Sequence, residues 1–194
     1  NITPVYPNFK FRKVDVYNKH YNPKGKTLAR EFRFPYEDET FDFIFLTSVF
    51  THMLGPELRH YVDEFRRVLR PGGRCLMTCF LLNDESKQLV GEKKAVYDLS
   101  HPAGEGFTCV PDDPEFAIGF DESDMAAWLA ERGFEIDGTY YGRWCGRPEF
   151  TCLQDIVVYR KTDLPPGSGW ADRIAALAPR PKGLVQSIRD YLKF

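Results

Sequence analysis

The sequence has 194 residues, of which 43% are hydrophobic and 28% are charged, and a chain of this length can bury one sizeable core. Its formal net charge of -2 at pH 7 gives no bulk attraction to nucleic acid or to an anionic membrane. Five cysteines without a Cys-x-x-Cys pair predict no metal site and no disulfide framework, so we expect reduced thiols and a cytoplasmic location. No apolar run approaches the roughly 20 residues that span a bilayer.

The N-terminal part of the chain predicts one short strand and a long connection. Residues 9–15 alternate apolar and basic side chains and end in the acid Asp15, a pattern typical of an edge strand. Residues 18–33 are polar and contain Asn-Pro and Lys-Gly pairs, which indicate an irregular connection. An acidic turn at residues 34–40 then precedes a buried strand.

The middle of the chain predicts two neighbouring parallel strands. Residues 42–47 and 74–82 are apolar at consecutive positions, as expected for strands that are buried on both faces. Between them, Pro56 begins a helix with apolar residues at i, i+3, i+4 and i+7, and residues 71–73 end that helix. A strand, a helix and a second strand in this order predict a parallel crossover unit.

The second half predicts an excursion and a closing strand pair. Residues 83–120 show no sustained period apart from one short helix near 87–96, and we expect a lid or substrate loop. A helix from Asp121 to Arg132 and two paired strands at 134–141 and 155–161 follow. The expected organisation is a core at 1–162, a linker at 163–169 and a two-part amphipathic helical tail at 170–194 that docks on this domain or on a partner.

Short motifs in a fixed order carry a family resemblance. Phe-Asp stands at residues 41–42, Thr-His at 51–52 and Pro-Gly-Gly at 71–73. This order resembles the second half of class I S-adenosylmethionine-dependent methyltransferases. Uncharacterised bacterial members of that class look most similar at residues 15–20, 45–52 and 141–146.

The resemblance implies an α/β fold, a Rossmann-like open twisted sheet that is mostly parallel and has an antiparallel last strand. It also implies methyl transfer from S-adenosyl-L-methionine to a small-molecule acceptor by in-line displacement. The first two strands of the family fold, including its glycine-rich turn, are missing from the sequence. Because Asn1 is not an initiator methionine, we expect either an N-terminal segment that completes the sheet or self-association at the open edge.

The resemblance places the cofactor at two strand ends. Asp15 would lie near the adenine amino group and Val16 against the adenine ring, although Asp15 could equally be an ordinary strand-terminal acid. The turn after the strand at 42–47 would contact the methionine part of the cofactor, because ligands of open sheets lie beyond the carboxyl ends of strands. The candidates in this turn are Thr47, Ser48, Val49 and Phe50.

His52 is the candidate general base, since an unperturbed histidine titrates near pH 6.5. The alternative for His52 is a structural role, in which its ring holds the turn by a hydrogen bond. Aromatic and basic residues in the loop after residue 140, together with two in the excursion, are candidates for contact with the acceptor. They are Tyr97, His101, Tyr141, Arg143 and Trp144, with the alternative that Tyr141 and Trp144 plug the end of the core.

Two other functions compete with methyl transfer. A non-catalytic binding or scaffold domain built on the same fold is favoured by the missing glycine-rich turn if the natural protein begins at Asn1. A nicotinamide-dependent reductase is disfavoured by the Pro-Gly-Gly strand and by the closing strand pair.

Overall fold

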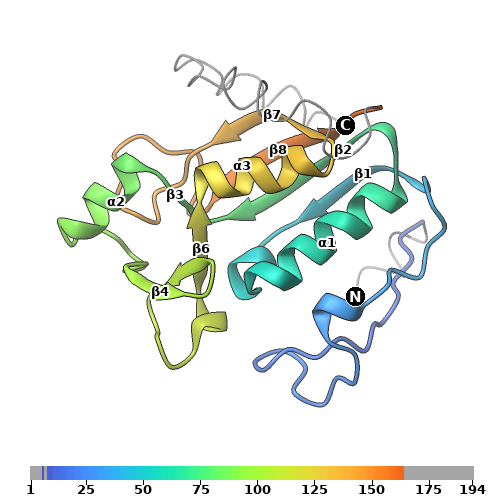
Figure 1. Cartoon of the computed structure of the whole chain (residues 1–194), viewed down its shortest axis with the longest axis horizontal. Coiled ribbons are helices and arrows are strands. Elements are labelled where there is room, and N and C mark those ends of the chain that lie inside the picture. Colours follow the sequence, from blue (N-terminus) through green and yellow to red (C-terminus); the bar gives the residue numbers. More distant parts are fainter. Residues whose placement is uncertain (1–5, 7, 164–194) are drawn as a thin grey trace.

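The computed structural model describes residue 6 and residues 8–163. All of the expected tail at 170–194 and nearly all of the linker lie outside the described residues. The described part has two four-stranded sheets, and Figure 1 shows helices α1 and α3 side by side on one face of the larger sheet. None of the described helices is long and apolar enough to cross a membrane.

The larger sheet has the order β1-β2-β8-β7. Its strands are β1 (Phe41–Leu46), β2 (Leu69–Cys79), β7 (Phe134–Tyr140) and β8 (Asp155–Lys161). Strands β1 and β2 are parallel, whereas β8 is antiparallel to both of its neighbours, β2 and β7. The predicted open α/β sheet with an antiparallel last strand is therefore confirmed.

Helix α1 (Gly55–Val68) buries one face against this sheet. Leu58 and Val62 have no exposed surface and Phe65 is nearly as buried, which follows from their i, i+4, i+7 spacing. Helix α3 (Glu122–Glu131) ends before Gly133, whose φ of 69° suits a glycine. Both predicted helices are confirmed, but α1 ends at Val68, before the Pro-Gly-Gly motif that was expected to end it. The Asp121 side chain pairs with Lys87 instead of capping α3.

Strand β1 forms one edge of the larger sheet. Phe43 and Phe45 lie on the same side of β1, with their rings stacked, and are 47% and 68% exposed. An edge strand with apolar side chains on an uncovered face is a surface suited to pairing or packing with further polypeptide.

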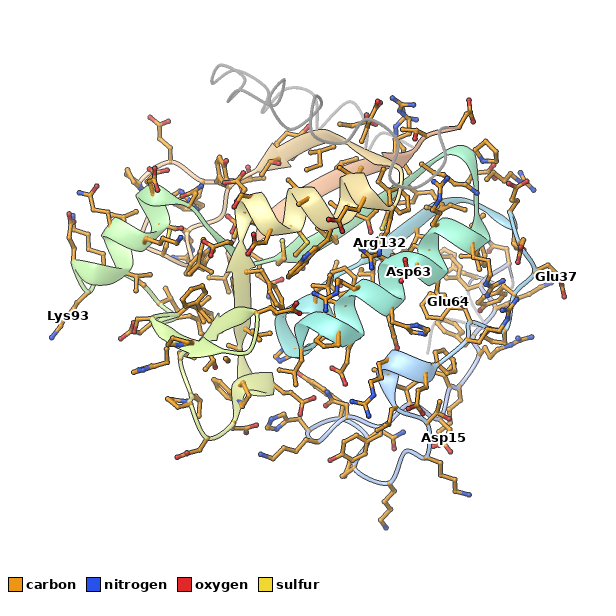
Figure 2. The ribbon with its side chains drawn as sticks, in the orientation of Figure 1. Asp15, Glu37, Asp63, Glu64, Lys93 and Arg132 are labelled. Atoms are coloured by element: carbon orange, nitrogen blue, oxygen red, sulfur yellow. The ribbon has the colours of Figure 1, made fainter. Side chains whose placement is uncertain are left out.

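The predicted strand at residues 9–15 is wrong. In this stretch Phe9 and Phe11 are exposed, and Val16 makes only an isolated bridge to Thr27. A strand needs a partner for its backbone groups, and no described strand lies beside this segment. The chain instead continues along α1, where the Glu64 carboxylate accepts a hydrogen bond from the Phe34 backbone at 2.7 Å (Figure 2).

The predicted strand at residues 74–82 is longer at its start and broken near its end. Strand β2 begins directly after α1 and takes in the Pro-Gly-Gly motif, where Gly72 has a φ of 74°. The chain leaves the sheet at Phe80, and β3 (Leu81–Leu82) pairs with β6 (Ile118–Asp121) in the second sheet.

The excursion at 83–120 contains more regular structure than the sequence predicts. Helix α2 (Asp84–Gly91) begins three residues earlier than expected because the Asn83 side chain caps it. Strands β4 (His101–Ala103) and β5 (Gly106–Thr108) form a hairpin, and β5 pairs with β6 to complete the second sheet. Strands of three residues are too short to show an alternating pattern.

Candidate functional site

The turn after β1 lies at the carboxyl edge of the larger sheet, where predicted site residues gather. Ser48 has a φ of 58°, a left-handed conformation that side chains other than glycine rarely adopt. The Ser48 backbone N–H donates to Thr78 Oγ1 at 2.7 Å, and the Ser48 hydroxyl accepts from Gln154 Nε2 at 2.6 Å. Strand ends from β1, β2 and β8 therefore meet at this turn, and the strained residue marks a candidate functional position.

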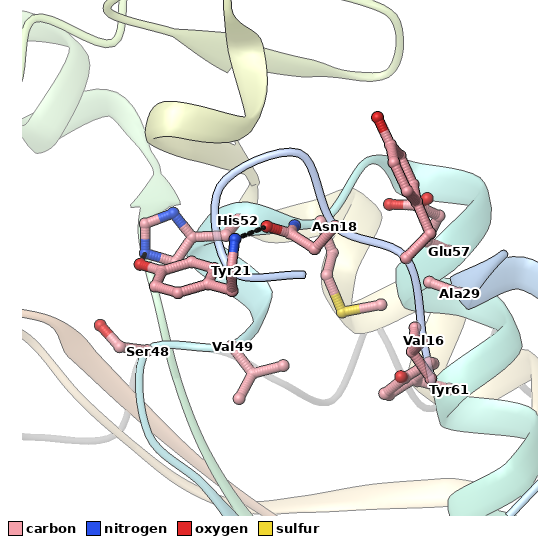
Figure 3. Close-up of a pocket in the computed structure, with 11 residues that line it drawn as sticks. Val16, Asn18, Tyr21, Ala29, Ser48, Val49, His52, Glu57 and Tyr61 are labelled. Atoms are coloured by element: carbon pink, nitrogen blue, oxygen red, sulfur yellow. Dashed lines mark hydrogen bonds between the residues drawn. The ribbon is translucent and has the colours of Figure 1, made fainter. Parts of the chain in front are cut away.

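A cavity of about 300 Å³ opens beside this turn (Figure 3). Three segments line it: residues 16–21 with Ala29, the turn at 48–53, and the first two turns of α1. Of the predicted site residues, Val16, Ser48, Val49 and His52 line the cavity. The residues that the sequence did not single out are Tyr17, Asn18, Tyr21, Ala29, Met53, Glu57 and Tyr61.

Three predicted cofactor residues lie outside the lining of this cavity. Asp15 and Thr47 are exposed beside it (Figure 2 labels Asp15). Phe50 begins the short 3-10 helix Phe50–His52, has no exposed surface and packs on the Phe65 ring at 6.0 Å between centroids. Direct contact between the Phe50 side chain and a ligand is therefore not supported, and its position is that of a core residue.

Glu57 brings a carboxylate to an otherwise largely apolar wall. Its Oε2 accepts from the backbone N–H of Leu54, the N-cap residue of α1, at 3.1 Å. Burial raises the pKa of Glu57 above its usual range, against the lowering effect of that hydrogen bond. Burial, together with the Glu57 charge, also raises the pKa of Tyr61 to about 12. The sequence did not identify Glu57 as a site residue, because an acid three residues after an N-cap is an ordinary capping residue.

Residues 16–22 form a strap over the mouth of the cavity. The Asn18 side chain accepts from the backbone N–H groups of His20 and Tyr21, both at 3.0 Å, and so tightens the loop. Lys19 and His20 both pair with Asp113, at 3.1 and 3.0 Å, which ties the strap to the 3-10 helix Pro114–Phe116. The excursion at 83–120 is thus connected to the cavity through the ion pairs between Asp113 and the strap.

His52 lies between the strap and the excursion. Its Nδ1 is 2.9 Å from the backbone oxygen of Glu115, and its Nε2 is 3.3 Å from the hydroxyl of Tyr21. Both ring nitrogens are therefore engaged, as the structural alternative for His52 requires. His52 and its Nε2 partner Tyr21 both line the cavity.

The loop after β7 opens on the same edge as the Ser48 turn, since β7 runs parallel to β1 and β2. Within it, Trp144 has no exposed surface and its Nε1 donates to Asp155 at 2.7 Å. Tyr97 packs its ring on Phe80, whose other neighbour is Trp144. Trp144 is part of a second hydrophobic cluster, which includes Phe80 and on which Tyr97 packs. The expectation that Trp144 contacts an acceptor is not supported by this position.

The other expected acceptor contacts differ in their exposure. His101 is exposed on β4, and Arg143 is exposed with its guanidinium 5.6 Å from the Phe150 ring centroid. Tyr141 is half-buried; its hydroxyl donates to Glu122 at 2.7 Å, and Arg147 covers its ring. Burial and the Glu122 carboxylate raise the pKa of Tyr141 well above its usual range. In the part of the chain that the structure describes, no three His, Cys, Asp or Glu residues are placed to hold a metal ion.

Comparison with known proteins agrees with the resemblance. Residues 8–77 match the family model described as a methyltransferase domain. This range covers the strap, β1, α1 and most of β2.

Solved structures give a weaker likeness. A SAM-dependent methyltransferase from Methanosarcina mazei is 21% identical, with 74% of this chain and 72% of that chain covered and a TM-score of 0.47. The 1,6-didemethyltoxoflavin-N1-methyltransferase of Burkholderia thailandensis, solved with 1,6-didemethyltoxoflavin and S-adenosylhomocysteine, is 17% identical. That match covers 70% of this chain but only 49% of the Burkholderia chain, with a TM-score of 0.42. Scores below 0.5 mark a partial likeness, which transfers no site residue.

Proposed function

We propose that this protein transfers the methyl group of S-adenosylmethionine to a small-molecule acceptor, because residues 8–77 match the model of a methyltransferase domain. One observation carries the proposal most directly. Val16 comes from one segment of the chain and Ser48 and Val49 from another, and all three line one cavity at the carboxyl edge of the sheet. Ligands of open α/β sheets bind at that edge.

The cavity fits part of such a cofactor. Val16, Ala29 and Val49 offer an apolar wall for a flat base, and Asn18 and Glu57 offer acceptors for amino or hydroxyl groups. We propose that Asp15 and Val16 hold the adenine end and that the turn at 47–50 holds the methionine end, with Phe50 supporting the turn from the core. A volume of about 300 Å³ stands at the lower limit for ligand sites, so the cavity accounts for a portion of the cofactor.

When bound, the cofactor supplies a sulfonium methyl group: a bond forms from the acceptor atom to the methyl carbon while the carbon–sulfur bond breaks and its electron pair stays on sulfur. The residues of this chain act by alignment and by exclusion of water, and His52 is proposed to take the acceptor's proton. His101 and Arg143 are proposed as acceptor contacts because their side chains are exposed, and Tyr141 because its loop opens on the same edge as the Ser48 turn.

A binding or scaffold domain without catalysis is the second candidate. The edge of β1 that pairs with no described strand, with Phe43 and Phe45 exposed, favours it, because such an edge can pair with another segment or another copy of this chain. An enzyme could equally carry an additional segment on that edge. The edge therefore indicates assembly with further polypeptide and does not distinguish a scaffold from an enzyme.

Calorimetry with S-adenosylhomocysteine tests the proposal on the full-length protein. We expect binding at micromolar concentration, and we expect Val16→Asp to weaken it by at least about tenfold, or about 1.4 kcal/mol. Val14→Asp is the matched control, because Val14 is exposed two residues earlier and does not line the cavity. Absence of heat with either S-adenosylhomocysteine or S-adenosylmethionine at about 1 mM would contradict methyl transfer.

A further inference from the structure

Tyr21 and His52 form a dyad at the mouth of the cavity. The Tyr21 hydroxyl lies 3.3 Å from His52 Nε2, and the two rings meet edge to face with 5.4 Å between centroids. Tyr21 belongs to the strap, whereas His52 ends the turn after β1, so the two residues come from segments 31 positions apart. Both line the same cavity (Figure 3).

The backbone of Glu115 fixes which nitrogen of His52 carries the proton. A carbonyl oxygen accepts hydrogen bonds and cannot donate them, so the 2.9 Å contact places the proton of the neutral ring on Nδ1. Nε2 then has a free electron pair and accepts from the Tyr21 hydroxyl. A neutral imidazole that is oriented through Nδ1 in this way presents Nε2 as a base.

The Tyr21 hydroxyl can bind a second group while it donates to His52. Tyr21 is the most exposed large hydrophobic residue of the described chain, at 72%, and a phenolic oxygen that donates one hydrogen bond can still accept another. The position of Tyr21 does not depend on His52 alone, because its backbone N–H is held by the Asn18 side chain and its neighbours His20 and Lys19 are paired with Asp113.

We propose that Tyr21 and His52 form a proton relay that serves an acceptor whose reacting nitrogen or oxygen atom still carries a hydrogen. This inference rests on the proposed function and names its substrate class. The acceptor X–H bond breaks and its proton moves to the Tyr21 oxygen, while the Tyr21 O–H bond breaks and that proton binds Nε2. The products of this step are a neutral tyrosine, an imidazolium and an acceptor atom with a free electron pair.

Histidine nitrogen NMR tests the dyad without any turnover. At about pH 8 an ordinary imidazole is neutral, and we expect the His52 signals to be those of the Nδ1–H form. In Tyr21→Phe the Nδ1–H form should persist, held by Glu115, while the Nε2 signal moves because its donor is gone. Tyr36→Phe removes a hydroxyl outside the cavity and should leave both signals unchanged. A dominant Nε2–H form in the unmodified protein would overturn the relay.

Acceptor chemistry tests the relay as a catalytic device. Catechol carries its proton at neutral pH, whereas thiophenol is largely ionised near pH 8, so only catechol requires proton removal. Tyr21→Phe should lower kcat for catechol methylation by at least about tenfold and change thiophenol methylation by less than about twofold. Equal losses with both acceptors would show that Tyr21 only holds the strap and would contradict the relay.

The two hypotheses fail in different ways. Absence of transfer to any acceptor, despite measurable binding of S-adenosylhomocysteine, counts against the proposed function and against the relay with it. Normal transfer combined with the wrong His52 form, or with unchanged catechol methylation in Tyr21→Phe, counts against the relay alone.

Discussion

The indole nitrogen of Trp144 donates to Asp155 Oδ2 at 2.7 Å, and neither residue has any exposed surface. The backbone N–H of Leu81 donates to the same oxygen, also at 2.7 Å, at the point where the chain passes from β2 to β3. The other carboxylate oxygen accepts from Gly142 and from the buried Arg147. One carboxylate therefore holds together the β2–β3 break and the loop after β7, whose last residue, Gln154, reaches the cavity edge at Ser48.

Replacement of Asp155 should be among the most damaging changes in the described chain. Burial raises the pKa of Asp155 to about 6, although its four donors act against this, so the carboxylate is ionised at pH 7. Asp155→Asn leaves the buried Arg147 with only the exposed Glu85 carboxylate as a counter-charge, and we expect a loss of roughly 3–5 kcal/mol in the free energy of unfolding. Urea denaturation measures this.

Asp137→Asn is the control for Asp155. Asp137 forms ion pairs with Arg74 and Arg160 on the surface, and exposed pairs contribute about 0–1 kcal/mol. Similar losses in the two variants would mean that the buried network does not stabilise the fold as the contacts indicate.

Trp144→Ala should act through the core. The change removes a fully buried indole that packs on Phe80, and we expect roughly 3–5 kcal/mol of destabilisation in chemical denaturation. Phe116→Ala, at a half-exposed aromatic, should stay within about 0.5 kcal/mol. If the Trp144→Ala protein keeps its stability but loses acceptor methylation, this prediction is wrong and Trp144 contacts the acceptor.

Ser48 allows a test of backbone strain at the site. Ser48→Gly relieves the left-handed conformation, whereas Ser48→Ala keeps it, and both lose the hydroxyl that accepts from Gln154. We expect the glycine variant to be more stable than the alanine variant by about 1 kcal/mol in urea unfolding. An alanine variant that is equally stable would show that the turn at 47–49 carries no such strain.

The ion pair between Glu64 and Arg67 should make stability depend on pH. Burial acts to raise the pKa of Glu64, but hydrogen bonds from Arg67 and from the Phe34 backbone outweigh it and lower the pKa below its usual range. The folded state therefore favours ionised Glu64, so its contribution is present above the ordinary glutamate pKa of about 4.3 and disappears as pH falls through the lowered value.

Glu64→Gln provides the measurement of this effect. The difference in unfolding free energy between the original protein and Glu64→Gln should be largest near neutral pH and shrink below about pH 4. Glu37→Gln, at an exposed position in the turn after Phe34 (Figure 2), should show no comparable trend. A difference that stays constant with pH would contradict the assignment.

Local pattern was enough to predict the framework of this protein. Consecutive apolar residues at β1 and β2, with an amphipathic helix between them, specify a parallel pair because few other arrangements bury such strands. The strand pair β7 and β8 and the helix ended by Gly133 are likewise short-range patterns. The turn that carries Ser48 and His52 followed from its place at a strand end.

Only the tertiary structure decided what the remaining segments do. Residues 9–15 have the alternation of a strand, yet without a partner for their backbone they stay outside the sheets. The sequence is equally compatible with Trp144 as a binding residue or as a core residue. The buried hydrogen bond from its indole to Asp155 places it in the core. The strap, Tyr21 and Glu57 reach the cavity through contacts between distant positions, and no local periodicity encodes which distant groups will satisfy one another's hydrogen bonds.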